Sequence, residues 1–158
     1  MTSAVPTPFS IDVRPADFDP AAEYRYLITQ AGDAGAVVTF VGLVREMGGT
    51  ESVDELYLEH YAGLTEKLIG EILDEAQSRW ELLAARVIHR VGHLQPGDQI
   101  VYVGIAAKHR ADAFAACEFV MDYLKTRAAF WKKETDSSGS RWIESRDTDK
   151  QRAERWKK

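Results

Sequence analysis

The apolar residues of this chain switch repeatedly between the spacing of strands and the spacing of helices. Strand-like apolar runs cover residues 10–13, 36–45, 53–61, 86–92, 99–107, 130–135 and 140–144. Helical spacing covers residues 20–32, 64–80 and 111–127. Strands that follow one another directly, with helices between the groups, are typical of α+β proteins. We therefore predict an α+β fold in a single domain, with helices packed on a mostly antiparallel sheet.

Two strand runs allow a more specific prediction. The segment AVVTFVGLVR at 36–45 is rich in β-branched residues and almost continuously apolar, which favours a central strand. The turn signal Gly48–Gly49 follows it, and the run at 53–61 comes next. We therefore expect 36–45 and 53–61 to pair as a hairpin. Before the first helical segment, Asp19–Pro20 reads as an N-cap followed by proline at the first helical position.

The chain has the size and composition of one globular domain. It has 158 residues, of which 45% are hydrophobic and 28% are charged, and a chain of this length can bury a sizeable core. We place the catalytic domain at residues 10–146. It lies between a loose tail at 1–9, rich in Pro, Ser and Thr, and a highly charged tail at 147–158 that is a candidate helix.

The sequence indicates a cytoplasmic protein. Its longest nearly apolar run, 34–44, has 11 residues, whereas a membrane-spanning helix needs about 20. Residues 1–9 lack the basic residues of a signal peptide. Cys117 is the single cysteine, so no internal disulfide can form, which fits a reducing compartment. The net charge of −5 argues against general nucleic-acid binding.

The segment YLKTRAAFWKK at 123–133 is the clearest candidate for chemistry. It has no acidic residue, although the whole chain has a net charge of −5. Its basic residues are Lys125, Arg127, Lys132 and Lys133. Lysine amines among other cations and aromatic rings lose their protons more readily, which makes them better nucleophiles or proton carriers. The alternative is a solvated basic turn that is anchored by a buried Phe130–Trp131 pair.

Two further segments are candidate phosphate-binding sites. Lys108, His109 and Arg110 directly precede the helical segment at 111–127, and the free amides at a helix start suit an anion. The alternative is an ordinary polar loop. Arg45 ends an apolar strand run, and arginine suits bidentate contact with phosphate. The alternative for Arg45 is a side chain that points into water.

The other polar residues predict neither a metal site nor a cofactor. His89 and His93 are four residues apart, but strand geometry would not converge them on one metal ion. Cys117 lies among small and aromatic residues of a helical segment, which favours a buried, unreactive thiol. The sequence contains no P-loop and no GxGxxG motif.

Longer motifs carry a family resemblance over residues 10–157. The strings are GAVVTFVGLVR, LEHYAGLTEK, VIHRVGHLQPGDQIVYVGIAAKHR and MDYLKTRAAFWKKE, followed by RWIESRDTD. In this order and spacing they resemble the catalytic (large) subunit of molybdopterin synthase. Two positions depart from the family pattern. Leu43 stands where many relatives have a polar or basic residue, and Ala129 stands where many have a loop-stiffening proline.

The resemblance implies a fold, an activity and partners. It implies an α/β hammerhead-type fold and a homodimer at the centre of a heterotetramer. At each end, a small ubiquitin-like sulfur-carrier subunit inserts its C-terminal Gly-Gly thiocarboxylate. The enzyme is a sulfurtransferase that needs no cofactor. It moves two sulfurs to cyclic pyranopterin monophosphate and so forms the dithiolene of molybdopterin, a step of molybdenum cofactor biosynthesis.

The resemblance also assigns site residues. It implies that Lys125 and Lys132 are catalytic. The substrate-binding residues that it implies are Arg45, His109, Arg110, Lys133 and Glu134.

Other functions stay open on the residues alone. A ferredoxin-like RNA-binding domain could use Phe130 and Trp131 as a stacking platform, and its RNA binding would depend steeply on salt. A small phosphate-ester hydrolase could use Arg45 and His109, and it would act without a protein partner. A scaffold paralogue would bind the carrier without turnover.

Overall fold

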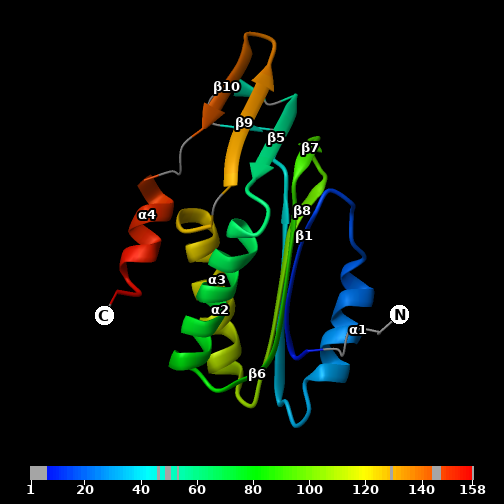
Figure 1. Ribbon diagram of the computed structural model, residues 1–158, viewed down its shortest axis with the longest axis vertical. Helices are drawn as coiled ribbons and strands as arrows, with labels where there is room; N and C mark the ends of the chain where they lie inside the picture. Colours follow the sequence, from blue (N-terminus) through cyan, green and yellow to red (C-terminus); the bar gives the residue numbers. More distant parts are fainter. Residues whose placement is uncertain are drawn as a thin grey trace.

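The computed structural model describes residues 7–45, 47–48, 51–52, 54–128, 130–143 and 147–157. This part of the chain forms a large sheet flanked by helices and a small sheet that extends from one end of it (Figure 1). The predicted α+β class with mostly antiparallel strands is confirmed. Most of the predicted N-terminal tail, residues 1–6, lies outside the described residues.

The large sheet has the strand order β1-β6-β8-β2. Its strands are β1 (Phe9–Arg14), β6 (Leu82–Arg90), β8 (Gln99–Ala107) and β2 (Ala36–Leu43). Strand β1 runs parallel to β6, and the other neighbours are antiparallel. Strand β8 is central, and its residues from 101 to 107 are all buried.

Helices cover both faces of the large sheet (Figure 1). Helix α1 (Pro20–Gln30) lies on one face, and α2 (Leu64–Arg79) and α3 (Arg110–Thr126) lie on the other. The predicted start of α1 is confirmed, because the Asp19 side chain accepts a hydrogen bond from the Ala21 amide and Pro20 is the first helical residue. None of the helices in the described ranges is long and apolar enough to cross a bilayer.

The small sheet has the order β10-β9-β5-β7 and is antiparallel throughout. Its strands are β10 (Gly139–Ile143), β9 (Phe130–Asp136), β5 (Glu55–His60) and β7 (Gly92–Leu94). A separate short pair joins β3 (Met47–Gly48) to β4 (Glu51–Ser52). Gly49, the second residue of the predicted turn signal, lies outside the described residues.

The predicted hairpin between 36–45 and 53–61 is wrong. Strand β2 pairs with β8 in the large sheet, whereas β5 pairs with β9 and β7 in the small sheet. Strand β2 is also an edge strand of the large sheet and not a central one. Helices α1 and α3 both contact β2, but Thr39, Phe40 and Leu43 are exposed, so a continuous apolar run does not fix a strand's place in the order.

Two strand boundaries also differ from the prediction. Strand β6 begins at Leu82, four residues before the predicted start. Strand β7 is a separate element because Gly92, with φ +87°, turns the chain from the large sheet into the small one.

The main core fills the space between the large sheet and helices α2 and α3. Its largest fully buried side chains include Ile69, Ile72, Val87, Val103, Ile105, Phe119 and Val120. On the opposite face, α1 packs closely on β8 at Gly104. A Cβ atom there would lie 2.8 Å from Leu27 Cδ2, so glycine permits the close approach.

The charged C-terminal segment forms helix α4 (Asp147–Glu154), which packs on α3. Just beyond it, Trp156 packs edge-on against Trp80 and Phe119. Its indole Nε1 donates a hydrogen bond of 2.7 Å to the buried Asp122 carboxylate, and Arg155 donates another of 2.9 Å to the same oxygen. Arg155 and Trp156 are thus fixed to the third helix.

Candidate active site

Helix α3 spans the large sheet from end to end and so separates the predicted site residues. It begins three residues after β8 ends, and it returns along the sheet until it reaches the small sheet, where β9 starts (Figure 1). Lys125 lies in its last turn, whereas His109 and Arg110 lie at its first turn. At 1.5 Å of rise per residue, the 15 steps from Arg110 to Lys125 span about 22 Å.

Lys132 and Glu134 project from the same face of β9, two residues apart. Lys132 Nζ lies 3.5 Å from Glu134 Oε1. Glu134 is buried, with 7% of its surface exposed, while Lys132 is partly exposed. We call the buried face of the small sheet, which carries Lys132 and Glu134, its inner face. The buried Glu134 carboxylate therefore holds the Lys132 amine on this inner face.

His89 lies at this face, and the charge of Lys125 acts on it. Its ring stacks on Phe130, with the centroids 4.0 Å apart and the planes 26° apart. The pKa of His89 is lowered to about 4, mainly by burial, and the charges of Lys125 and His60 contribute to this shift. The imidazole is thus neutral at pH 7. We call Lys125, His89, Phe130, Lys132 and Glu134 the junction cluster.

Apolar packing fixes the inner face of the small sheet that carries this cluster. Buried side chains from β5, from β7 and from the residue after β2 pack there beside Phe130, and they are Val44, Leu56, Leu58 and Leu94. Arg45 follows Val44, whose amide donates to the Asp98 carbonyl at 2.8 Å. Arg45 is exposed, and it leaves the large sheet at the end where the junction cluster lies.

An ion pair continues the inner face beyond Glu134. Asp136 is buried, and Arg141 from β10 forms a salt bridge with it. The hydrogen bond from Arg141, together with those from Ser138, lowers the pKa of Asp136 well below its usual range. The charge of this carboxylate is therefore fixed at neutral pH.

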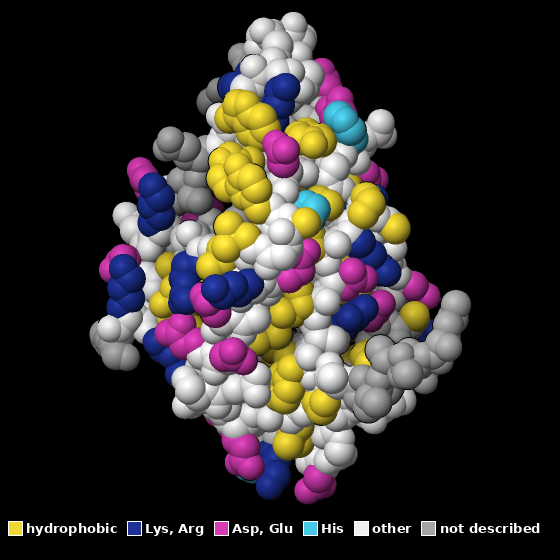
Figure 2. All heavy atoms as spheres, in the orientation of Figure 1, with side chains coloured by type: hydrophobic (Ala, Val, Ile, Leu, Met, Phe, Trp, Pro, Cys, Tyr) yellow, Lys and Arg dark blue, Asp and Glu magenta, His cyan; other side chains and the backbone are white. Residues whose placement is uncertain are grey.

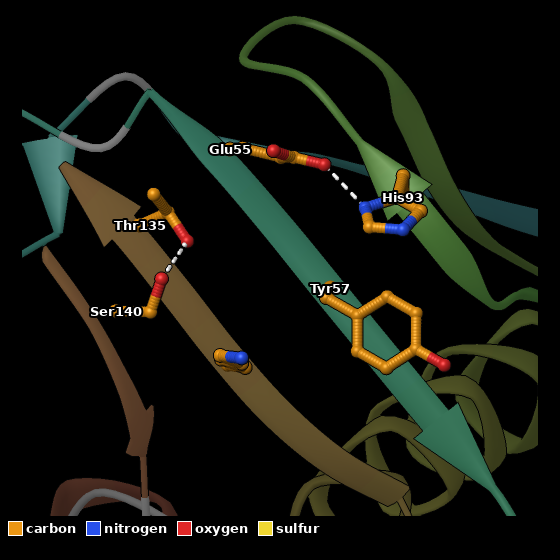
Figure 3. A pocket seen from close by; sticks show the side chains of 6 residues that line it. Glu55, Tyr57, His93, Thr135 and Ser140 are labelled. Atoms are coloured by element: carbon orange, nitrogen blue, oxygen red, sulfur yellow. Dashed lines mark hydrogen bonds and ion pairs between the residues drawn. The ribbon is translucent and has the colours of Figure 1, made fainter.

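Lys133 lies on the opposite, outer face of β9. Its Nζ lies 5.8 Å from the centre of the Trp142 ring. It lines an open pocket of about 440 Å³ together with Tyr57, Thr135 and other residues of the same face (Figure 3). In that pocket Glu55 pairs with His93, and Thr135 hydrogen-bonds to Ser140 at 2.8 Å. The structure does not bring Lys133 together with Lys132 and Glu134.

Exposed aromatic side chains mark the same outer face. Figure 2 shows hydrophobic side chains gathered over the small sheet at the top of the molecule. Tyr61 and Trp131 pack edge to face, with their ring centres 4.5 Å apart, and both are exposed, as is Trp142. Trp131 is therefore not the buried anchor that the alternative reading of the basic stretch requires.

The thiol of Cys117 is buried in α3 against β8. Its Sγ lies 4.0 Å from the Val103 carbonyl oxygen. Burial raises its pKa to about 12. The predicted inert thiol agrees with this environment, and the chain has no other cysteine to carry sulfur.

The described residues contain no group of three or more His, Cys, Asp or Glu side chains that could hold a metal ion. The two histidines considered for such a site lie on different surfaces. His89 lies in the junction cluster, and His93 lies in the outer pocket.

Sequence reasoning did not assign His89 to the site. Its place beside Lys125 depends on how the two sheets and α3 meet, and no local pattern reveals this. The opposite orientations of Lys132 and Lys133, in contrast, follow from the two-residue period of the predicted strand.

The fold is that of proteins of molybdopterin biosynthesis. The MoaE protein of Burkholderia ambifaria MC40-6, a molybdopterin biosynthesis protein, superposes with a TM-score of 0.81 at 48% identity, over 93% of this chain and 97% of that one. A Helicobacter pylori 26695 structure shares the fold, with a TM-score of 0.66 and 18% identity. The match covers 89% of this chain and 92% of that one. That structure is a protein–protein complex of subunits 1 and 2 of molybdopterin-converting factor.

Sequence comparison identifies the family. The family model for MoaE protein matches residues 13–127. A molybdopterin synthase catalytic subunit of Vibrio cholerae is 58% identical over 146 residues, which cover 92% of this chain and 97% of that protein. The chain belongs to the MoaE family of molybdopterin synthase catalytic subunits. Its activity is that of a sulfurtransferase in molybdenum cofactor biosynthesis, which leaves the RNA-binding and hydrolase alternatives without support.

Proposed function

We propose that this chain transfers sulfur from the thiocarboxylated C-terminus of a small ubiquitin-like carrier subunit to cyclic pyranopterin monophosphate. The product is the dithiolene of molybdopterin. The observation that carries this proposal is the junction cluster. It gathers the two lysines that family resemblance makes catalytic at the point where α3 meets the small sheet.

Each residue of the cluster has a distinct proposed role. Lys125 acts as an acid/base group or as a transient nucleophile at the thioester-like intermediate. Lys132 stabilises the negative charge that develops there, and Glu134 orients it from 3.5 Å. Arg45 lies at the same end of the large sheet and is available to the substrate phosphate or to the carrier's carboxyl end.

The sulfur must come from outside the chain. The Cys117 thiol is buried and its pKa is raised, so it cannot supply a thiolate at neutral pH. A thiocarboxylate is already ionised and brings its own sulfur. The single cysteine, which has no partner for an internal disulfide, also supports a cytoplasmic location for the enzyme.

His109 and Arg110 lie far from Lys125 in the same chain, so a shared substrate site needs a second copy of the chain to supply them. His109 and Arg110 are exposed at the start of α3, about 22 Å from Lys125 by the rise of the helix. If all three groups contact one small substrate, His109 and Arg110 must come from the other copy. This supports the homodimer within a heterotetramer, with Lys125 and His109 of one site on different chains. We assign Lys133 no contact with the substrate, because it lies on the outer face.

A reconstituted assay tests the activity. The chain is mixed with a thiocarboxylated carrier and cyclic pyranopterin monophosphate, and dithiolene product is detected as its fluorescent oxidised derivative. Product should require all three components, and Lys125→Ala should lower turnover by about 100-fold or more. Lys67→Ala, at an exposed lysine of α2, is the matched control. A stable complex with the carrier but no product would indicate a scaffold protein instead.

A mixing experiment tests the shared site. Lys125→Ala and His109→Ala are each expected to be nearly inactive as pure proteins. When the two are unfolded together and refolded, random pairing gives mixed dimers in which one of the two sites is intact. Activity should then return to about a quarter of the wild-type value. No recovery, with mixed dimers demonstrated by mass spectrometry, would refute the shared site.

A further inference from the structure

The outer edge of β2 is an unprotected strand edge. Within the described residues, β2 pairs with β8 along one side and with no strand along the other. Proteins usually protect such an edge, with its backbone N–H and C=O groups, by charged residues or proline. The opposite edge strand, β1, carries Asp12 and Arg14. The sequence of β2, AVVTFVGL, contains neither a charge nor a proline, so this edge is suited to pair with another strand.

One stripe of α3 faces the same direction as this edge. Helix α3 packs over β8 and β2, whereas α2 packs over β1 and β6. Phe119 of α3 faces α2, because the guanidinium of Arg79 in α2 lies 4.9 Å from the centre of its ring. Nearly half a turn away from Phe119, a stripe at helical spacing therefore points away from α2 and beyond β2. This seam stripe consists of Arg110, Phe114, Met121 and Lys125.

Exposed aromatic side chains lie on both the edge and the seam stripe. Phe114 is 62% exposed, and Phe40 of β2 is 40% exposed. Phe40 lies on the α3 side of β2, since Ala36 and Val38, at the same two-residue period, pack into the main core. The 17 residues of α3 and the 8 residues of β2 each extend for about 25 Å. Two layers of about 10 Å each then give about 500 Å² on each copy, or about 1,000 Å² in total, the size that a biological interface needs.

We propose that β2 pairs antiparallel with β2 of a second copy around a two-fold axis, which joins the two large sheets into one sheet of eight strands, four from each copy. This inference rests on the proposed shared site and identifies the surface that forms it. A strand edge is complementary to itself in antiparallel pairing, as a two-fold interface requires. Neighbouring strands lie about 4.8 Å apart, so two α3 helices, each midway over β8 and β2, lie about 10 Å apart, the contact distance of packed helices.

This pairing brings opposite ends of the two α3 helices together. Helix α3 and strand β2 both span the large sheet from end to end (Figure 1). The two-fold axis therefore passes between the middles of two antiparallel α3 helices. Arg110 of the second copy then lies across from Lys125 on the facing seam stripe, with helix axes about 10 Å apart instead of about 22 Å of helix between them. The helix dipoles are also complementary, because each positive N-terminal end lies beside a negative C-terminal end.

Sedimentation of the purified chain, without carrier or substrate, tests this surface. The wild type should be a dimer. Phe114→Asp places a charge in the seam stripe and should raise the dimer dissociation constant by at least about tenfold. Trp142→Asp, at a residue of the outer face that is 53% exposed, is the matched control and should leave the constant unchanged. Circular dichroism reports whether each variant keeps the fold. A monomeric wild type, or an unchanged constant in a folded Phe114→Asp, would overturn the proposal.

Cysteine cross-linking locates the interface without weakening it. Thr39→Cys and Phe40→Cys are made separately, because the two-fold axis passes through the middle of β2, where both residues are exposed. On mild oxidation, one of them should form a disulfide with its own counterpart in the second copy. Trp142→Cys is the matched control, and Cys117 is buried. No disulfide at either position, or an equal yield in Trp142→Cys, would overturn the proposal. So would loss of the disulfide on adding the carrier, which would show that the carrier occupies this edge.

Turnover connects the interface with the proposed function. In the reconstituted assay, Phe114→Asp should lower turnover per chain by about tenfold at concentrations below its dimer dissociation constant. Turnover should recover as the concentration of the variant is raised, and a loss that does not recover would contradict the proposal. If the wild type makes no product, the proposed function fails, whereas sedimentation and cross-linking still decide the interface.

Discussion

The two faces of the small sheet differ although the same strands build both. On the inner face of β9, Lys132 meets a buried carboxylate and lies beside the Phe130–His89 stack. On the outer face, Lys133 meets the Trp142 ring and an open pocket. Lys132 and Lys133 are adjacent in sequence but have different surroundings. Alternate residues of a strand project to opposite faces of the sheet, so neighbouring basic residues lie on different surfaces. Here only the inner face carries the junction cluster.

The largest expected effect compares these two lysines directly. Lys132→Ala should lower turnover in the reconstituted assay by about 100-fold, because it removes a cation placed where negative charge develops. Lys133→Ala removes an equal charge one residue away and should change turnover by less than about twofold. Equal losses of turnover in the two variants would show that both faces of the small sheet take part in the reaction. The proposed difference between the faces would then be wrong.

Stability should also differ between the faces. Leu58 is 5% exposed and packs against Leu94 and Phe130, so Leu58→Ala should lower the free energy of unfolding by about 2–4 kcal/mol. Trp142 on the outer face is 53% exposed. Trp142→Ala should lower the free energy of unfolding by less than about 1 kcal/mol. Urea titrations of the two variants give both values, and a larger loss for Trp142→Ala would contradict this assignment of the core face.

The inner-face carboxylate of Asp136 should make stability depend on pH. Its pKa is lowered by hydrogen bonds from Arg141 and Ser138. A carboxylate with a lowered folded-state pKa stabilises the fold above its unfolded value of about 3.9, and this contribution is lost as the pH falls towards the folded value. Asp136→Asn should therefore lower Tm at pH 7, and the difference from wild type should shrink below about pH 4. A difference that stays constant with pH would argue against this ion pair.

The smallest effect is expected for the ion pair of the outer pocket. Glu55 and His93 are 42% and 75% exposed, and exposed pairs contribute little because water screens them. Glu55→Gln should change the free energy of unfolding by no more than about 0.5 kcal/mol in a urea titration at pH 6. A loss several times larger would mean that this face is covered in solution.

Local patterns predicted most of the elements, but not the short strands β3, β4 and β7 and not all of the strand partners. The Asp19–Pro20 start of α1 was predictable because capping acts within a few residues. The pairing of β2 with β8, across more than fifty residues, was not, because the two-residue period of a strand does not specify its neighbour. The nearby turn signal suggested β5 instead.

The residues of the candidate site also divide into those that local sequence predicts and those that only tertiary packing brings together. Family motifs indicated Lys125 and Lys132, and the period of the strand could have separated Lys132 from Lys133. The length of the predicted helix could likewise have separated His109 from Lys125. The contact of His89 with Phe130, 41 positions later, depends on tertiary packing and could not be predicted from spacing.

The bonds at the end of the chain have a practical consequence. Asp122 accepts hydrogen bonds from Trp156 and Arg155, and it lies three residues, or about one helical turn, before Lys125. Removal of residues 155 and 156 would take away both donors and loosen the helix that holds the reactive amine. Variants and fusions used in any assay should therefore leave the contacts of residues 155 and 156 with Asp122 intact.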